Sequence, residues 1–203
     1  MSMISDEQEI TTVTPADWVA GPPQGFWTYE AYAALPDDGG RYEIVQGVLI
    51  MSPAPTPEHQ SVLGEIYSYL RECIQLTGRG LVYMGPLDVE LSERNVFQPD
   101  VMVVLKEHID RLQKKHFVGA PDLAVEIISP SSATYDRLTK YDTYEQAGIP
   151  EYWLVNPKRR TIEVFVLEER RYHSLGVFQG EQVLPSRLIP SRIVPIERFF
   201  AWV

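Results

Sequence analysis

An apolar run from Leu123 to Ile128 carries a carboxylate, Glu126, near its centre. The length of the run and its β-branched residues predict a buried strand. Burying a carboxylate is costly unless another group compensates its charge. Pro130 and the serines beside it end the strand and favour the start of a helix, which carries Lys140. Any fold of this chain must therefore bring a cation or a proton to Glu126.

The chain has 203 residues and a net charge of −10, from 28 acidic and 18 basic side chains. A chain of this length buries a sizeable core. We expect a single domain over residues 26–203, preceded by an N-terminal tail over residues 1–25 that is flexible in part. The negative charge counts against non-specific coating of nucleic acid. It is compatible with a nucleic-acid enzyme, because a bound metal or a local basic patch offsets the field.

Cysteine content and hydropathy bear on the compartment. Cys73 is the single cysteine, so an intrachain disulfide is excluded, which suits a reducing environment. We find neither a basic segment followed by an apolar run at the start of the sequence nor an apolar run of about 18 residues. We therefore expect a cytoplasmic protein without a signal peptide or a membrane span.

Turn residues and hydrophobic periodicity divide the chain into elements. The predicted elements are, in order, a helix over 29–35, a hairpin of strands over 41–45 and 48–51, a long amphipathic helix over 58–76, strands over 81–84 and 87–91, a strand over 96–105 interrupted at Pro99, a short helix and loop over 106–119, the strand over 123–128, a helix ending at Gly148, strands over 151–155, 161–167 and 172–178, and a short helix over 195–200. This order predicts an α/β or α+β sheet with helices packed on its faces.

A second carboxylate, Asp100, also lies in an apolar strand. If the strands of Asp100 and Glu126 are neighbours, both side chains can point to one spot on the sheet. Two like charges at one spot repel unless one carries a proton or a cation lies between them. Carboxylate oxygens suit Mg²⁺ or Mn²⁺, which can activate water and stabilise charge on a phosphoryl group.

Three further residues are candidates for the same site, each with a structural alternative. Lys140 adds a positive group, or it forms a surface pair with Asp136 worth about 0.3 kcal/mol. Glu43 is either an acidic site residue or a solvated residue of an edge strand. His59 is either a site residue or a capping or solvated residue at a helix start. The remaining histidines lack the spacing of a zinc site.

The chain resembles the Uma-type family of restriction-endonuclease-like proteins, within the PD-(D/E)xK nuclease superfamily. The resemblance extends over about residues 28–167 and depends on several pieces in matching order. These are RYEIVQGVLIMSP (41–53), His59, FQPDVMVV (97–104), PDLAVEIISPSS (121–132), YDRLTKYDTYEQAGIPEYWLVNP (135–157) and the strand TIEVFVL that follows.

The resemblance implies a restriction-endonuclease-like α/β fold, with a mixed β-sheet flanked by helices. It implies that Asp100 and Glu126 form the metal-binding acidic pair and that Lys140 positions or activates the attacking water. Glu43 would be the upstream acidic residue, and His59 a polar residue near the same pocket. The superfamily's lysine normally follows the second acidic residue by two positions, where this chain has Ile128, so Lys140 must reach over the sheet.

The function that we predict is that of a Mg²⁺-dependent endodeoxyribonuclease, which hydrolyses DNA phosphodiester bonds with a metal-activated water. One alternative is a non-catalytic nuclease-fold module that binds DNA or protein, and another is a metal-dependent hydrolase of a smaller substrate. A basic stripe beside the acidic pair favours the nuclease, and a closed pocket favours the smaller substrate. The nearest basic residues in sequence are Lys106, Arg111, Lys114 and Lys115.

A homodimer would place two cutting sites on the two strands of a duplex. The apolar strands over 151–155 and 161–167 are the candidates for its interface. The second Pro-Asp pair, Pro121-Asp122, precedes Glu126 by four residues, and we expect it to form the turn into the strand.

Overall fold

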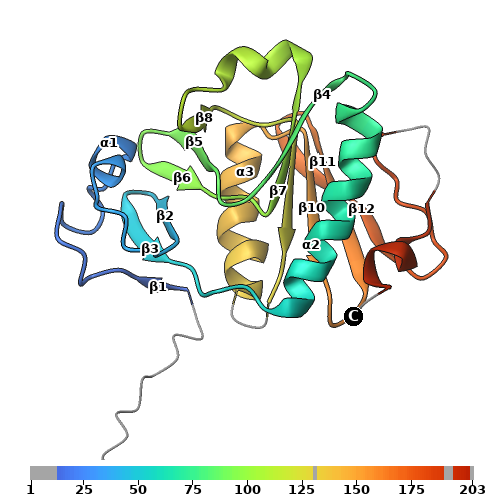
Figure 1. Cartoon of the computed structure of the whole chain (residues 1–203), viewed down its shortest axis with the longest axis horizontal. Coiled ribbons are helices and arrows are strands. Elements are labelled where there is room, and N and C mark those ends of the chain that lie inside the picture. The colour runs from blue at the N-terminus through green and yellow to red at the C-terminus, as the bar shows by residue number, and fades with distance from the viewer. Residues whose placement is uncertain (1–12, 130–131, 190–193, 202–203) are drawn as a thin grey trace, which may run out of the picture.

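The computed structural model describes residues 13–129, 132–189 and 194–201 and folds them into two six-stranded sheets (Figure 1). The larger sheet has the order β12-β11-β10-β9-β7-β4. β9 and β10 run parallel and all other neighbours in this sheet run antiparallel, which confirms the predicted mixed sheet. Its strands are β4 (Gly80–Met84), β7 (Val101–Leu105), β9 (Leu123–Ile127), β10 (Glu151–Asn156), β11 (Thr161–Glu168) and β12 (Arg171–Gln179).

Helices cover both faces of the larger sheet, with α2 on one face and α3 on the other (Figure 1). Because side chains alternate along a strand, Val125 and Ile127 join the core under α2, and Ala124 joins the core under α3. Glu126 therefore faces the side of α3. The helical elements are α1 (Tyr29–Ala33), α2 (Pro57–Leu70), α3 (Tyr141–Ala147), the π-helical η1 (Arg71–Gln75) and η3 (Tyr135–Lys140), and the 3-10 helical η2 (Lys106–Arg111) and η4 (Ile196–Phe200).

The start of α2 is defined by its capping residues. The Thr56 side chain accepts a hydrogen bond from the backbone N–H of His59 at 3.3 Å, and Pro57 occupies the first turn, where its missing N–H costs nothing. One side of the helix is buried, including Val62 and Ile66. The predicted helix over 58–76 is confirmed as α-helix up to Leu70 and continues as a π-helical turn, η1.

The smaller sheet lies beside the larger one and carries α1 at its outer side (Figure 1). Its hairpin, β2 and β3, turns at Gln46 and Gly47, whose φ angles of 50° and 79° fit the paired left-handed residues of a type I′ turn. At the start of the described chain, Thr14 and Pro15 pair with β3 and Ala16 is buried. Its strands, in spatial order, are β1 (Thr14–Pro15), β3 (Val48–Met51), β2 (Tyr42–Val45), β6 (Asn95–Phe97), β5 (Asp88–Ser92) and β8 (His116–Val118).

The prediction of one strand over 96–105 is wrong, because the chain changes sheet there. Residues 95–97 form β6 of the smaller sheet, and Val101–Leu105 form β7 of the larger sheet. Pro99 lies between them, and proline has no N–H for a ladder hydrogen bond. The break directs the segment Gln98–Asp100 across the space between the two sheets.

The segment over 106–119 differs from its prediction, and parts of two other predicted segments lie outside the described residues. The segment over 106–119 contains the expected short helix, η2, but it ends in a strand, β8, that pairs parallel with β5. Pro130 and Ser131, which we expected to separate the central strand from its helix, lie outside the described residues, as do residues 1–12 of the predicted tail. The division between tail and domain stays a prediction.

The strands proposed for a dimer interface are wrong for that role. β10 lies between β9 and β11, and its residues Glu151–Val155 are buried within the single chain. β11 is likewise an inner strand, between β10 and β12. The homodimer itself stays a prediction.

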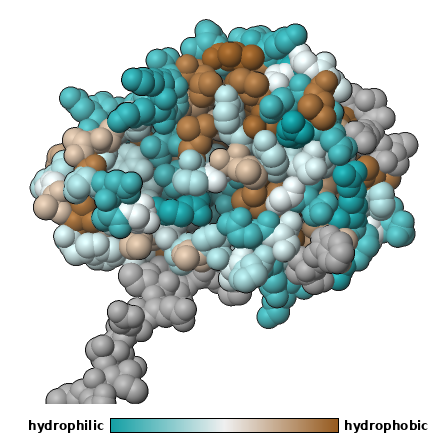
Figure 2. Space-filling view, viewed as in Figure 1, coloured by the Kyte–Doolittle hydropathy of each residue, from teal (hydrophilic) through white to brown (hydrophobic). Residues whose placement is uncertain are grey.

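The surface in the view of Figure 2 is mostly hydrophilic, apart from a hydrophobic area at the top and scattered apolar groups. Scattered apolar groups are ordinary on a folded protein. None of the helices in the described ranges combines the length and hydrophobicity needed to cross a bilayer.

Candidate functional site

All five predicted site residues line one small cavity. Its volume is about 60 Å³, enough for a few water molecules. The cavity lies where the segment Gln98–Asp100 passes from one sheet to the other. The predicted residues that line it are Glu43 of β2, His59 of α2, Asp100 before β7, Glu126 of β9 and Lys140 at the end of η3.

Strand register brings the two predicted metal ligands together. Val101 pairs with Val125 in the antiparallel ladder of β7 and β9, so Asp100 comes opposite Glu126. Oδ2 of Asp100 accepts a hydrogen bond from the backbone N–H of Ile127 at 2.8 Å. The two strands are neighbours, as the sequence argument required.

His59 contacts the same oxygen of the Asp100 carboxylate as the backbone N–H of Ile127. Its Nε2 lies 3.0 Å from Oδ2 of Asp100, and because an ionised carboxylate only accepts hydrogen bonds, Nε2 carries the proton. Burial raises the pKa of the Asp100 carboxyl, but His59, the charge of Lys140 and the N–H of Ile127 together outweigh burial, so this pKa lies below its ordinary value. Asp100 is therefore ionised at neutral pH.

Lys140 reaches over the sheet and contacts three carboxylates. Its Nζ lies 2.8 Å from Glu126, 3.2 Å from Glu43 and 3.6 Å from Asp136. Burial lowers the pKa of Lys140, but the surrounding carboxylates raise it well above its ordinary value, so the group is a permanent ammonium at neutral pH. The contact with Asp136 exists as the structural alternative proposed, but both side chains are buried, so this is no surface pair.

Glu126 lies among more negative than positive charge. Oε2 accepts from Lys140, and Oε1 accepts from the Tyr144 hydroxyl at 2.6 Å. Burial, together with the charges of Asp100, Asp136 and Glu43, raises the pKa of Glu126 well above its ordinary value despite Lys140. Burial likewise raises the pKa of Asp136 to about 6. The cavity is thus short of positive charge.

Glu43 is a buried site residue and not a solvated edge residue. Its Oε1 accepts a hydrogen bond from the backbone N–H of Gln98 at 2.8 Å, and its Oε2 accepts from the Tyr135 hydroxyl at 3.1 Å. These bonds tie β2 of the smaller sheet to the crossing segment and to η3. Glu43 therefore closes the cavity on the side of the smaller sheet.

Sequence reasoning missed Gln98 and Tyr135, which line the cavity, and Tyr144, which lies outside the lining but donates a hydrogen bond to Glu126. One signal was present: Asp136, Lys140 and Tyr144 recur at four-residue steps and so share one face of a helix. That face is the one turned to Glu126.

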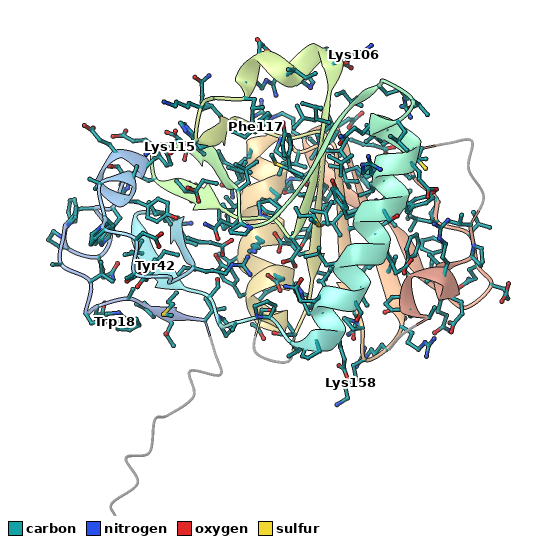
Figure 3. All side chains as sticks on the ribbon, in the orientation of Figure 1. Trp18, Tyr42, Lys106, Lys115, Phe117 and Lys158 are labelled. Carbon is teal, nitrogen blue, oxygen red and sulfur yellow. The ribbon has the colours of Figure 1, made fainter. Side chains whose placement is uncertain are left out.

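The basic residues considered for a stripe beside the acidic pair do not line the cavity. These four residues are Lys106, Arg111, Lys114 and Lys115. Figure 3 places Lys106 at the upper edge and Lys115 beside the smaller sheet. Asp122 also lies elsewhere, where it accepts a hydrogen bond from the backbone N–H of Leu105 at 2.7 Å and pairs with His108, in keeping with a structural role at the strand entry.

The donors of the cavity fit a hydrated divalent cation held by few protein ligands. In the part of the chain that the structure describes, no group of three or more histidine, cysteine or acidic side chains is arranged to enclose a metal ion. Mg²⁺ usually binds through one or two carboxylates and keeps several of its waters. Asp100 and Glu126 supply that number of carboxylates, and the cavity has room for waters.

The hydrogen bond from the Tyr144 hydroxyl to Glu126 can be tested by its contribution to stability. We expect Tyr144→Phe to lower the free energy of unfolding by about 1.5–3 kcal/mol, because the substitution removes a hydrogen bond to a buried acidic group. Urea unfolding followed by circular dichroism measures the change. Tyr67→Phe, at a partly buried position of α2, is the control and should change stability by less than about 0.5 kcal/mol. Equal effects in the two variants would contradict the expectation.

Comparisons with known proteins identify the family and the fold. A model of the Uma2 family, described as "Putative restriction endonuclease", matches residues 29–197. The crystal structure of a "putative nuclease belonging to DUF820" from Anabaena variabilis aligns with 86% of this chain and 98% of its own, with a TM-score of 0.73 and 20% sequence identity. Likeness at that identity shows the fold alone. The search of curated proteins found no match. The family and the fold class predicted from the motifs are both confirmed.

Proposed function

Since this chain belongs to the Uma2 family of restriction-endonuclease-like proteins, we propose that it hydrolyses phosphodiester bonds of DNA with the help of Mg²⁺ or Mn²⁺. One observation carries the proposal. Asp100 and Glu126, from neighbouring strands, share a cavity with a lysine that three carboxylates hold in place. Two carboxylates that can bind a divalent cation, beside a fixed lysine ammonium, are suited to in-line attack of water at phosphorus.

Asp100 and Glu126 are the residues that would hold the cation. A divalent cation bound there supplies Lewis-acid stabilisation of the charge that develops at phosphorus and makes a water molecule more acidic. His59 and the N–H of Ile127 fix the orientation of the Asp100 carboxylate. The Tyr144 hydroxyl does the same for Glu126. Such second contacts keep ligands in a productive orientation.

Lys140 acts in this proposal as a fixed positive charge and not as a base. Its raised pKa keeps it protonated at neutral pH, so it cannot accept a proton from water. A protonated lysine can orient the attacking water and stabilise negative charge on the phosphoryl oxygens. Glu43 and Asp136 hold its ammonium near Glu126.

A second candidate is hydrolysis of a smaller phosphate ester. Two observations favour it: the cavity is small, and the acidic chain places none of the four basic residues named above at its lining. Long DNA gains affinity from many phosphate contacts with basic residues. A substrate with one or two phosphates does not need them.

A plasmid assay tests the proposal. We expect the wild type to nick supercoiled plasmid with Mg²⁺ or Mn²⁺ and to stop on addition of EDTA, and we expect Asp100→Asn to lower the rate by a factor of about 10² or more. Asp122→Asn is the matched control, because Asp122 also follows a proline but lies outside the cavity. It should cut at close to the wild-type rate.

Two other outcomes would redirect the assignment. Hydrolysis of bis(p-nitrophenyl) phosphate without nicking of plasmid would favour the smaller substrate. A wild type that cuts neither but binds DNA would mean that this nuclease fold serves as a binding module, and the catalytic proposal would be wrong.

A further inference from the structure

Three buried polar side-chain atoms have no hydrogen-bond partner within the described residues: Nε of Arg41, Nδ1 of His59 and Oε1 of Gln98. All three side chains line the cavity that holds Asp100 and Glu126. Buried polar atoms are almost always paired, so each exception requires an explanation. Their convergence on one cavity indicates a place built for a polar ligand.

Arg41 is fixed at the edge of this cavity by its backbone. It directly precedes β2, and its carbonyl accepts a hydrogen bond from the N–H of Ser52 at 2.9 Å. Because side chains alternate along a strand, Arg41 faces the same side as Glu43. Its guanidinium reaches toward the segment of Gly85 and Asp100, since a methyl group on Gly85 would stand 3.6 Å from Nη2 of Arg41 and 3.8 Å from Cα of Asp100.

The charges around Arg41 leave it available to an incoming anion. Four carboxylates line the cavity, which are Glu43, Asp100, Glu126 and Asp136. Lys140 pairs with three of them, whereas no ion pair of Arg41 occurs within the described chain. An unpaired guanidinium with a planar fork of donors matches the oxygens of a phosphate group.

The two other unpaired atoms belong to Gln98 and His59. Nε2 of Gln98 donates to Oδ1 of Asp88 at 2.8 Å and to the Tyr32 hydroxyl at 3.4 Å, which fixes the amide with Oε1 turned elsewhere. Nε2 of His59 faces Asp100, so its Nδ1 is the ring nitrogen that stays open to another polar group. A guanidinium N–H beside two further unpaired polar atoms suits a phosphate oxygen accompanied by water molecules.

We propose that Arg41 binds a non-bridging oxygen of the substrate's phosphate in this cavity, while Gln98 and His59 form hydrogen bonds with the water around it. The inference rests on the proposed function for its substrate class. It goes further by assigning the substrate contact to a residue outside the acidic pair and its lysine.

Binding measurements test this inference independently of cleavage. The probes are orthophosphate with Mg²⁺, followed by calorimetry, and a fluorescent DNA duplex with EDTA, followed by anisotropy at several salt concentrations. The variants are Arg41→Met, which keeps the length of the stem, and Arg41→Lys, which keeps the charge. Arg71→Met, on the exposed side of η1, is the control for the loss of one positive charge.

We expect Arg41→Met to lower the affinity for both probes roughly tenfold. The slope of log K for DNA binding against log salt concentration should fall in magnitude by about 1. Arg41→Lys should retain part of the affinity, and Arg71→Met should behave as the wild type. The melting temperature of Arg41→Met should stay close to that of the wild type, because Nε of Arg41 has no hydrogen-bond partner within the described residues. A role in holding the fold together would lower it.

The outcomes separate this inference from the proposed function. If wild type cuts DNA and Arg41→Met cuts and binds equally well, the inference is wrong and the nuclease proposal stands. If wild type cuts nothing but Arg41→Met loses affinity for either probe, the phosphate site stands and the catalytic proposal fails. Affinity for orthophosphate alone supports Arg41 as the anion site of a smaller substrate. A wild type that binds neither probe overturns the inference.

Discussion

Replacing Lys140 by methionine is expected to destabilise the protein by about 3–5 kcal/mol at pH 7, the range observed when one partner of a buried ion pair is removed. Lys140 is the shared partner of Glu126, Glu43 and Asp136, and all four side chains are buried. Without the ammonium, these carboxylates lie close together in a poorly solvated cavity. Urea unfolding at pH 7 measures the loss.

The stability that the Lys140→Met variant loses should depend on pH. In the wild type, the pKa of Lys140 is raised on folding, so its contribution is complete below its ordinary value of 10.5 and is lost only as the pH rises through the folded value. In the variant, the carboxylates favour protons in the folded state, so stability should recover as the pH falls from 7 toward 4. Lys158→Met, at an exposed turn at the lower edge of Figure 3, is the control and should change little at either pH.

A loss below 1 kcal/mol at pH 7, or a loss that grows on acidification, would contradict this account of Lys140. The former would mean that the carboxylates are neutralised without the lysine. The latter would mean that Lys140 matters for packing and not for charge.

Replacing Glu126 by glutamine is expected to abolish cleavage without unfolding the protein. Glutamine keeps an oxygen for Lys140 and Tyr144 but loses the charge that a divalent cation requires. We expect the plasmid-nicking rate to fall by a factor of about 10³. Glu145→Gln, at a carboxylate that lies outside the cavity and binds Arg171, is the matched control and should retain the wild-type rate.

The Glu126→Gln variant should lose activity but keep or gain stability. Burial and neighbouring carboxylates raise the folded pKa of Glu126, so its contribution to stability is most favourable below its ordinary pKa and declines as the pH rises toward the folded value. Glutamine does not titrate, so Glu126→Gln should be at least as stable as the wild type at pH 7 and show a smaller gain on acidification. A strongly destabilised variant would indicate that Glu126 is a structural residue, and normal cleavage would exclude it from catalysis.

The central part of the site was predictable because it violates a rule of burial. A carboxylate in the middle of an apolar strand needs a group that compensates its charge. This requirement, with the ordered motifs of the family, indicated both Lys140 and the strand of Asp100. Alternation along β9 then gave the face of Glu126. These inferences use only local periodicity and the cost of buried charge.

The rest depended on tertiary structure. The residues 96–105 look like one strand, but the chain changes sheet at Pro99, and this crossing brings Gln98 to Glu43 and Asp100 to Glu126. Local propensity does not encode which sheet a strand joins. The sequence did not indicate a site role for Arg41 either. A charged residue at the start of a strand is usually solvent-exposed, and only the tertiary structure places Arg41 at the cavity.

Calorimetric titration of Mn²⁺ into the wild type and into Glu126→Gln would show whether Asp100 and Glu126 form a metal site. We expect the wild type to bind one Mn²⁺ per chain at millimolar or lower concentration and Glu126→Gln, still folded, not to bind it. If the wild type binds no Mn²⁺ in this range, or if the variant binds it equally well, then Asp100 and Glu126 do not form a metal site, and the catalytic proposal is wrong.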